Sequence, residues 1–201
     1  MFNLIRRDII LQKWLLLTFI PFVAFFIIMD VHPALTFLVA SIFIPFNTFG
    51  YDNKAETNIL LNSLPYTRKE IIASRYLGSI VYMALSIGVT SLALIVSNKS
   101  FTMTDIAIGG GLFLAFAAFT FPLFYIFKTD YLLHIVIISF ILLAGIGPPI
   151  VTFLTDNVTV ITDLIYRFST PVIYTGAAAI VMFFYAVSWG VSTIIYQRKA
   201  F

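Results

Sequence analysis

The chain contains no cysteine and has few charged residues for its length. Its 201 residues include 12 Lys and Arg and 9 Asp and Glu, so charged residues make up only 10% of the sequence. Without cysteine, the chain forms no disulfide and offers no thiolate to a metal ion or to a nucleophilic mechanism. A soluble domain of this size covers its surface with charged side chains, so this composition excludes an ordinary soluble protein. The net charge of +3 is too small to indicate nucleic-acid binding.

Long apolar runs take the place of the missing charge. Hydrophobic residues make up 61% of the sequence, Phe alone occurs 22 times, and the mean hydropathy is +1.02. A helix that crosses the hydrocarbon core of a bilayer needs roughly 20 apolar residues. Six such runs predict an all-α, polytopic membrane protein with a single transmembrane domain over residues 1–201 and spans near 14–29, 34–50, 74–96, 106–127, 132–154 and 171–196.

The basic residues indicate which way the spans face. With six spans, ten of the twelve Lys and Arg fall on the same side of the membrane, and only Lys99 and Arg167 fall on the other. Because cytoplasmic loops carry such an excess of basic residues, we expect both termini in the cytoplasm. No small-residue cleavage site follows the first basic residues, so we expect the first span to be retained.

The predicted spans contain no Asp, Glu, Lys or Arg well inside them. Intramembrane enzymes and proton-driven carriers usually place ionisable groups there. His134 lies a few residues into the fifth span, where an interfacial or capped histidine is favoured over a proton relay or metal ligand. The sequence also lacks H-E-x-x-H, G-x-S-x-G and phosphate-loop motifs, so we expect no catalytic residue, no metal site, no cofactor bound directly and no ATP hydrolysis by this chain.

One polar segment interrupts the apolar pattern between the second and third spans. Residues 51–74 read YDNKAETNILLNSLPYTRKEIIAS. Asp52 or Asn53 is suited to cap a short helix, which ends near Pro65 because the residue before a proline avoids the α conformation. Thr67 and Glu70 match a capping box, which predicts that the third membrane helix begins there. The alternative interpretation is a basic, well-capped loop that only maintains topology.

The same segment resembles the permeases of the ABC-2 type ATP-binding-cassette family. The resemblance rests on an upstream acid, an S-L-P-x-[ST]-R motif and a basic-Tyr-Leu start of the third span. Arg75 stands where many relatives carry lysine, and it keeps the positive charge. The matching residues are Asp52, Lys54, Glu56, Asn62, Ser63, Leu64, Pro65, Thr67, Arg68, Lys69, Ile71, Ser74, Arg75, Tyr76 and Leu77.

The resemblance implies a function and a set of partners. It implies the permease subunit of an ATP-driven exporter in a bacterial cell membrane, moving amphipathic or hydrophobic cargo such as a peptide, an antibiotic or a lipid-like molecule. Two permeases, identical or related, pair with two cassette ATPases, which hold the ATP and Mg²⁺. Residues 55–66 then form a cytoplasmic coupling helix that docks on the ATPase. The expected contact residues are Glu56, Leu60, Leu64, Pro65, Arg68 and Lys69.

Two further segments are candidates for handling cargo. Phe113, Phe116 and Phe124 fall near one face of the fourth span and predict an aromatic-lined path; packed or lipid-facing phenylalanine explains the same pattern. At the outer end of the fifth span, two consecutive prolines predict a break. With the acidic residues beyond it, this region resembles the re-entrant helices that form an extracellular lid in ABC-2 permeases, and a kinked surface loop is the alternative. The lid residues are Pro148, Pro149, Asp156 and Asp163.

Two other functions agree with six spans and no ATPase motif. One is the substrate-binding membrane subunit of an energy-coupling-factor importer, which would lack the basic L-P-x-[ST]-R helix on the cytoplasmic side. The other is a membrane protein without a transport function, such as an assembly factor or an intramembrane hydrolase. The absence of a catalytic pair in the spans disfavours the hydrolase.

Overall fold

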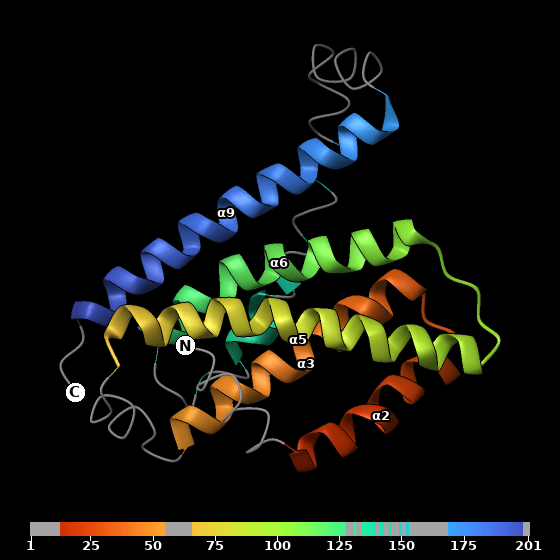
Figure 1. Cartoon of the computed structure of the whole chain (residues 1–201), viewed down its shortest axis with the longest axis horizontal. Coiled ribbons are helices and arrows are strands. Elements are labelled where there is room, and N and C mark those ends of the chain that lie inside the picture. Colours follow the sequence, from red (N-terminus) through yellow and green to blue (C-terminus); the bar gives the residue numbers. More distant parts are fainter. Residues whose placement is uncertain are drawn as a thin grey trace. The chain divides into compact units, whose positions relative to one another are not determined.

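The computed structural model describes residues 13–54, 66–127, 131, 134–139, 141–142, 145, 149, 152 and 169–198. Five long α-helices and no strand are found over these residues (Figure 1). In chain order they are α2 (Lys13–Ile28), α3 (Pro33–Lys54), α5 (Arg68–Val96), α6 (Met103–Ile126) and α9 (Thr170–Arg198). For this described part of the chain, the all-helical prediction is confirmed.

Three of these helices are long and apolar enough to cross a membrane, namely α5, α6 and, from Pro171, α9. α2 and α3 carry shorter apolar stretches, at Leu17–Ile28 and Pro33–Thr48. The sequence therefore folds as a helical membrane protein. The fifth expected span, 132–154, is described only in part, with residues 134–139 helical, so the count of six spans stays a prediction.

The chain divides into two compact units. The first unit comprises Met1–Phe113 and Trp189–Phe201, and the second comprises Leu114–Ser188. α6 and α9 each contribute one part to the first unit and one part to the second. In the first unit, α3 packs against α5 and α2 (Figure 1).

The core of the first unit is apolar and rich in aromatic rings. Phe43 of α3 contacts two rings of α2, with centroid distances of 5.6 Å to Phe19 and 4.5 Å to Phe22. α6 joins this core by a close approach at Gly109, where a Cβ atom would lie 2.6 Å from Cβ of Phe37 and 2.8 Å from the carbonyl oxygen of Ala34. Only glycine allows the two backbones to come this near.

Two similar turns follow α2 and α5 at one end of the first unit. Asp30 after α2 and Asn98 after α5 both adopt left-handed backbone conformations, with φ of 56° and 53°. In each turn the next amide bonds back across the helix end, from Val31 to Phe26 and from Lys99 to Leu94, as in a Schellman motif. Nζ of Lys99 lies 2.6 Å from Oδ1 of Asp30, so an ion pair joins the two turns.

The end of α3 differs from the sequence-based expectation. Asp52 and Asn53 were expected to cap a separate short helix, but both lie in the last turn of α3, which continues to Lys54. Gly50 does not end the helix, because glycine inside a helix costs only about 1 kcal/mol relative to alanine. The predicted coupling helix, 55–66, lies outside the described residues except for Tyr66, which is not helical.

The exposed face of α5 is apolar and its buried face is polar. The exposed positions recur every four residues and are between 38% and 51% exposed: Leu77, Val81, Leu85 and Val89. Ser86 and Thr90 lie on the opposite face and are completely buried. A helix at the surface of a soluble protein shows the reverse arrangement. The exposed face of α5 is therefore suited to contact lipid.

Candidate functional site

α5 begins with the capping box that the sequence predicted. The hydroxyl oxygen of Thr67 accepts the amide of Glu70 at 3.2 Å, and a carboxylate oxygen of Glu70 accepts the amide of Thr67 at 2.8 Å. These reciprocal bonds satisfy two backbone donors that a helix start otherwise leaves unpaired. The first residue of α5 is thereby fixed directly after the predicted coupling segment.

Arg68, the first residue of α5, reaches the end of α9. Its Nη1 donates to the carbonyl oxygen of Gln197 at 2.8 Å and lies 3.4 Å from the carbonyl oxygen of Tyr196. The last carbonyls of a helix have no partner within the helix, and a cation there is favourable toward the helix dipole. Arg68 therefore caps the end of a helix that is 128 residues away in the chain.

A second contact between the same two helices lies deeper in the first unit. The hydroxyl of Tyr76 and the hydroxyl of Ser192 are 2.7 Å apart, and both residues are completely buried. The Tyr76 ring stacks on Trp189 with a centroid distance of 5.8 Å and an interplanar angle of 10°. We call the five residues that join these helices the α5–α9 junction: Arg68, Tyr76, Trp189, Ser192 and Gln197.

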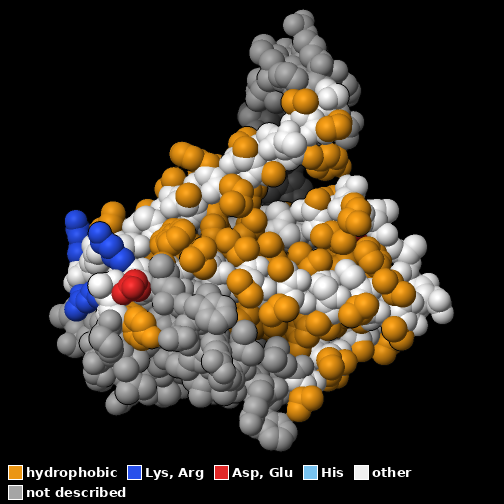
Figure 2. All heavy atoms as spheres, viewed as in Figure 1, with side chains coloured by type: hydrophobic (Ala, Val, Ile, Leu, Met, Phe, Trp, Pro, Cys, Tyr) orange, Lys and Arg blue, Asp and Glu red, His pale blue; other side chains and the backbone are white. Residues whose placement is uncertain are grey.

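The structure separates two residues that the sequence grouped together as ATPase contacts. Arg68 is partly buried and bonded to α9, whereas the neighbouring Lys69 is exposed. Lys and Arg side chains gather around the start of α5 and the end of α9, next to an acidic side chain (Figure 2). The other expected contacts lie outside the described residues: Glu56, Leu60, Leu64 and Pro65.

The three phenylalanines expected to line a cargo path are all packed in the interior. Phe113 is 1% exposed, and Phe116 and Phe124 are each 5% exposed. Phe124 stacks on Phe121 with a centroid distance of 6.2 Å. In this conformation the three rings are therefore covered, as in the packed-core alternative. A path along them stays a prediction for another conformation.

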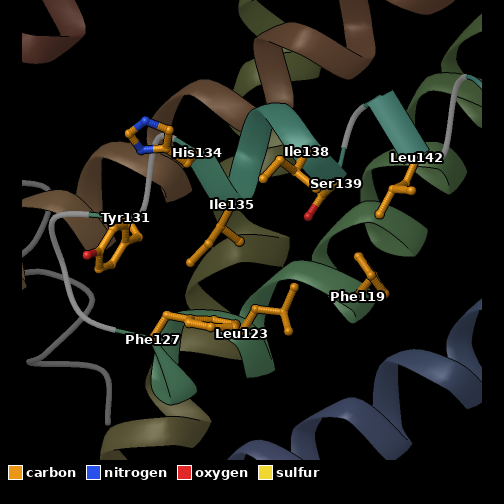
Figure 3. Close-up of a pocket in the computed structure, with 9 residues that line it drawn as sticks. All are labelled: Phe119, Leu123, Phe127, Tyr131, His134, Ile135, Ile138, Ser139 and Leu142. Carbon is orange, nitrogen blue, oxygen red and sulfur yellow. The ribbon is translucent and has the colours of Figure 1, made fainter.

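Other phenylalanines of α6 line a cavity in the second unit. The cavity has a volume of about 380 Å³, within the range of ligand pockets. One wall is α6 and the facing wall is the partly described segment after it (Figure 3). The apolar side chains of the two walls are Phe119, Leu123, Phe127, Ile135, Ile138 and Leu142. Such a lining suits an alkyl chain or an aromatic ring.

Tyr131 and His134 lie at one end of this cavity (Figure 3). Both are exposed, and their ring centroids are 6.3 Å apart. Among the described residues, no group of three His, Asp or Glu side chains is placed to hold a metal ion. His134 thus provides a polar group at the edge of an apolar cavity.

The predicted lid is described at one position only. Pro149 is exposed and helical, while Pro148, Asp156 and Asp163 lie outside the described residues. The sequence analysis found the start of α5 but not its partner in α9. A signal was present, because Ser188, Ser192 and Tyr196 recur at four-residue spacing in an otherwise apolar helix. Polar groups at that spacing mark the side of a membrane helix that faces protein.

Comparison with known proteins gives one match. A family model described as an ABC-2 family transporter protein matches residues 3–197. No curated protein and no solved structure matches the chain. The matched range includes the residues on which the sequence resemblance rested and the whole α5–α9 junction. It disfavours an energy-coupling-factor subunit and a protein without a transport function. The chain belongs to the ABC-2 family of transporter proteins.

Proposed function

We propose that this chain is the permease subunit of an ATP-driven exporter in a bacterial cell membrane, with both termini in the cytoplasm. Its cargo is amphipathic or hydrophobic: a peptide, an antibiotic or a lipid-like molecule. ATP and Mg²⁺ bind to a separate cassette ATPase, and two permeases pair with two ATPases. The family match and the apolar composition support the membrane and transport parts of this proposal.

The α5–α9 junction is the observation that carries the proposal. The coupling segment, 55–66, leads directly into a helix whose first residue, Arg68, is bonded to the end of α9. Tyr76, eight residues further along α5, is bonded to Ser192 of α9. At about 1.5 Å per residue, these two attachments are about 12 Å apart along α5. Two separated attachments restrain both the position and the direction of one helix relative to the other.

This arrangement gives a route from the ATPase into the membrane. A displacement of the coupling segment moves the capped start of α5, and the junction carries the same displacement into the end of α9. α9 is one continuous helix from Thr170 to Arg198, with residues in both compact units. The junction lies in the part of α9 that belongs to the first unit, so a displacement of the coupling segment reaches that part of α9. ATP changes cargo access only if the ATPase favours one permease conformation over the other.

The cavity of the second unit supports the cargo class. Its apolar walls suit the hydrophobic part of an amphiphile, and Tyr131 and His134 place polar atoms at one end. The residues that line it include no Lys, Arg, Asp or Glu, and their polar side chains are Tyr131, His134 and Ser139. Cargo with separate apolar and polar parts is therefore favoured.

The test compares two adjacent basic residues. The permease carrying Arg68→Gln or Lys69→Gln is purified with the ATPase that accompanies the wild-type chain and is reconstituted in sealed lipid vesicles. ATP hydrolysis and transport are then measured with a dansyl-labelled amphipathic peptide as the probe. We expect Arg68→Gln to retain the ATPase but to lose both the effect of the permease on ATP hydrolysis and the efflux of the probe, because the bond to α9 is broken. Lys69→Gln removes the same charge from an exposed side chain that is not bonded to α9. Because Lys69 is itself a predicted ATPase contact, the two variants are compared at equal amounts of retained ATPase.

Two results would contradict the proposal. If no cassette ATPase accompanies the wild-type permease, the assignment to an ATP-driven exporter fails. If Arg68→Gln couples as well as the wild type while the contact to Gln197 is demonstrably lost, the junction does not transmit the movement.

A further inference from the structure

The buried face of α5 is polar along most of the helix. Its residues follow one another at intervals of three or four and are each less than 8% exposed: Arg75, Ser79, Tyr82, Ser86 and Thr90. At about 1.5 Å per residue this polar face of α5 is about 22 Å long. It therefore extends over most of the roughly 30 Å thickness of the hydrocarbon core.

Three buried hydroxyls lack partners, two of them on this face of α5 and one on α3. Oγ of Ser86, Oγ1 of Thr90 and Oγ of Ser41 on α3 are fully buried and make no hydrogen bond in the described part of the chain. Other hydroxyls on the same helices bond to their own backbone, as Thr48 does to Ile44 at 3.0 Å and Ser79 does to Tyr76 at 2.8 Å. A buried hydroxyl without a partner is destabilising. The three unpaired hydroxyls therefore destabilise the conformation described here.

The three hydroxyls lie at similar depths, measured from the helix ends that the Asp30–Lys99 ion pair joins. α3 packs against α5, and the ion pair between Asp30 and Lys99 joins the turn before α3 to the turn after α5. Counted from these outer ends at about 1.5 Å per residue, Thr90, Ser41 and Ser86 lie about 9, 12 and 15 Å deep. They therefore occupy the outer half of the membrane rather than being scattered along the bundle.

We propose that Ser86 and Thr90, in the part of the polar face of α5 toward Val96, form with Ser41 the surface that the polar part of the cargo contacts during transport. Hydroxyls both donate and accept hydrogen bonds, so this surface takes uncharged hydrogen-bonding groups such as peptide amides or sugar hydroxyls. It is closed in the present conformation, and it opens when α3 and α5 separate. Water or cargo then supplies the partners that the three hydroxyls lack. This inference rests on the proposed exporter function.

The absence of cysteine makes the inference directly testable, because each introduced thiol is unique. The variants Ser41→Cys, Ser86→Cys and Thr90→Cys are treated with a membrane-impermeant cationic methanethiosulfonate reagent in vesicles that contain the permease and its ATPase, with and without ATP. The reagent modifies a thiolate, which forms only where water reaches the sulfur. Val23→Cys, at a 1% exposed position of the apolar core, and Ser100→Cys, at an exposed position of the outer turn, are the controls.

We expect ATP to accelerate modification at the three hydroxyl positions. When the open conformation is populated at only roughly 0.1–10%, the labelling rate falls to that fraction of its value in the open conformation, so it rises at least about tenfold when ATP makes the open conformation dominant. Val23→Cys stays unmodified and Ser100→Cys reacts at the same rate in both conditions. If Val23→Cys reacts as fast as the others, general loosening explains the labelling and the inference is overturned.

The outcomes distinguish the inference from the function on which it rests. An ATPase that accompanies the permease and hydrolyses ATP, with the three cysteine variants unmodified or modified equally with and without ATP, overturns the polar surface and leaves the exporter intact. If no ATPase accompanies the wild-type chain, the exporter itself is refuted. Thr90→Val is a second variant that keeps the side-chain shape. We expect Thr90→Val to unfold at the wild-type temperature or above and to lose coupled ATPase activity. If the Thr90 hydroxyl is purely structural, Thr90→Val instead unfolds at a lower temperature and keeps its coupled ATPase activity.

Discussion

The hydroxyl of Tyr76 lies 2.7 Å from the hydroxyl of Ser192, although the two residues are 116 positions apart in the chain. With the bond from Arg68 to the end of α9, this contact makes the start of α5 and the last turns of α9 one mechanical element. A transporter whose energy comes from a separate protein needs such an element at the side that the partner touches.

Tyr76→Phe removes one hydroxyl and keeps the ring stacked on Trp189. The Ser192 hydroxyl then loses its partner in a fully buried position, so we expect a destabilisation of about 1–2 kcal/mol. Thermal unfolding of the purified permease measures this change. Tyr174→Phe, at a position that is 48% exposed, is the matched control and leaves the unfolding temperature unchanged. Equal effects of the two substitutions would show that the Tyr76 hydroxyl is not held by Ser192.

Thr67→Ala and Thr102→Ala remove the capping residue from the starts of two different helices. Thr102 and Asp105 form the same reciprocal bonds before α6 that Thr67 and Glu70 form before α5. We expect each substitution to cost about 1 kcal/mol in thermal unfolding, the usual value for a lost N-cap. Only Thr67→Ala also lowers coupled ATPase activity, because only that cap follows the coupling segment. A loss of coupling in Thr102→Ala as well would assign the effect to stability alone.

Gly109→Ala and Gly111→Ala test the close approach of α6 to α3. The new Cβ at position 109 would meet Cβ of Phe37 at 2.6 Å and a backbone oxygen at 2.8 Å, so the helices must move apart. We expect a loss of about 1–3 kcal/mol, as for other overpacked cores. At Gly111 nothing lies within 4 Å, and alanine there is neutral or stabilising by up to about 1 kcal/mol. Thermal unfolding of the two variants measures these changes. A Gly109→Ala protein that is as stable as the wild type would contradict the close packing of α6 on α3.

Asn98→Ala and Asn98→Gly test the left-handed turn after α5. Asn98 has a φ of 53°, a conformation that costs an ordinary residue roughly 1–2 kcal/mol and costs glycine almost nothing. We therefore expect Asn98→Ala to unfold at a lower temperature and Asn98→Gly to match or exceed the wild type. If alanine and glycine behave alike at this position, the turn does not have the left-handed geometry in the membrane.

The start of α5 was predictable because its determinants are local. Thr67 and Glu70 are three residues apart, so their reciprocal bonds need only one turn of helix and no other part of the chain. The turn between α2 and α3 is local in the same way, since Pro33 is favoured at the first helical position. The capping box of Thr102 and Asp105 has the same spacing, but its acid is aspartate, which lies outside the usual Ser/Thr-x-x-Glu/Gln pattern.

The role of Arg68 was not predictable in this way. The motif around it predicted a contact with the ATPase, which stays a prediction, and the structure adds a bond from its guanidinium to Gln197 that the motif did not indicate. A cation near a helix start gives no signal about which distant carbonyl it will meet. The burial of Phe113 and Phe116 was not predictable for a related reason, because their own spacing does not reveal the neighbours that cover them in this conformation.

The amino-acid sequence alone determined that this protein is helical, that it is a membrane protein, and that its third apolar helix begins directly after the capping residue Thr67. Each of these depends on composition or on residues within one helical turn. The tertiary structure decided which face of α5 is buried, which residues join it to α9, and which hydroxyls are left without partners. Those features depend on contacts between residues as far apart as Tyr76 and Ser192, which only the packing of the helices brings together.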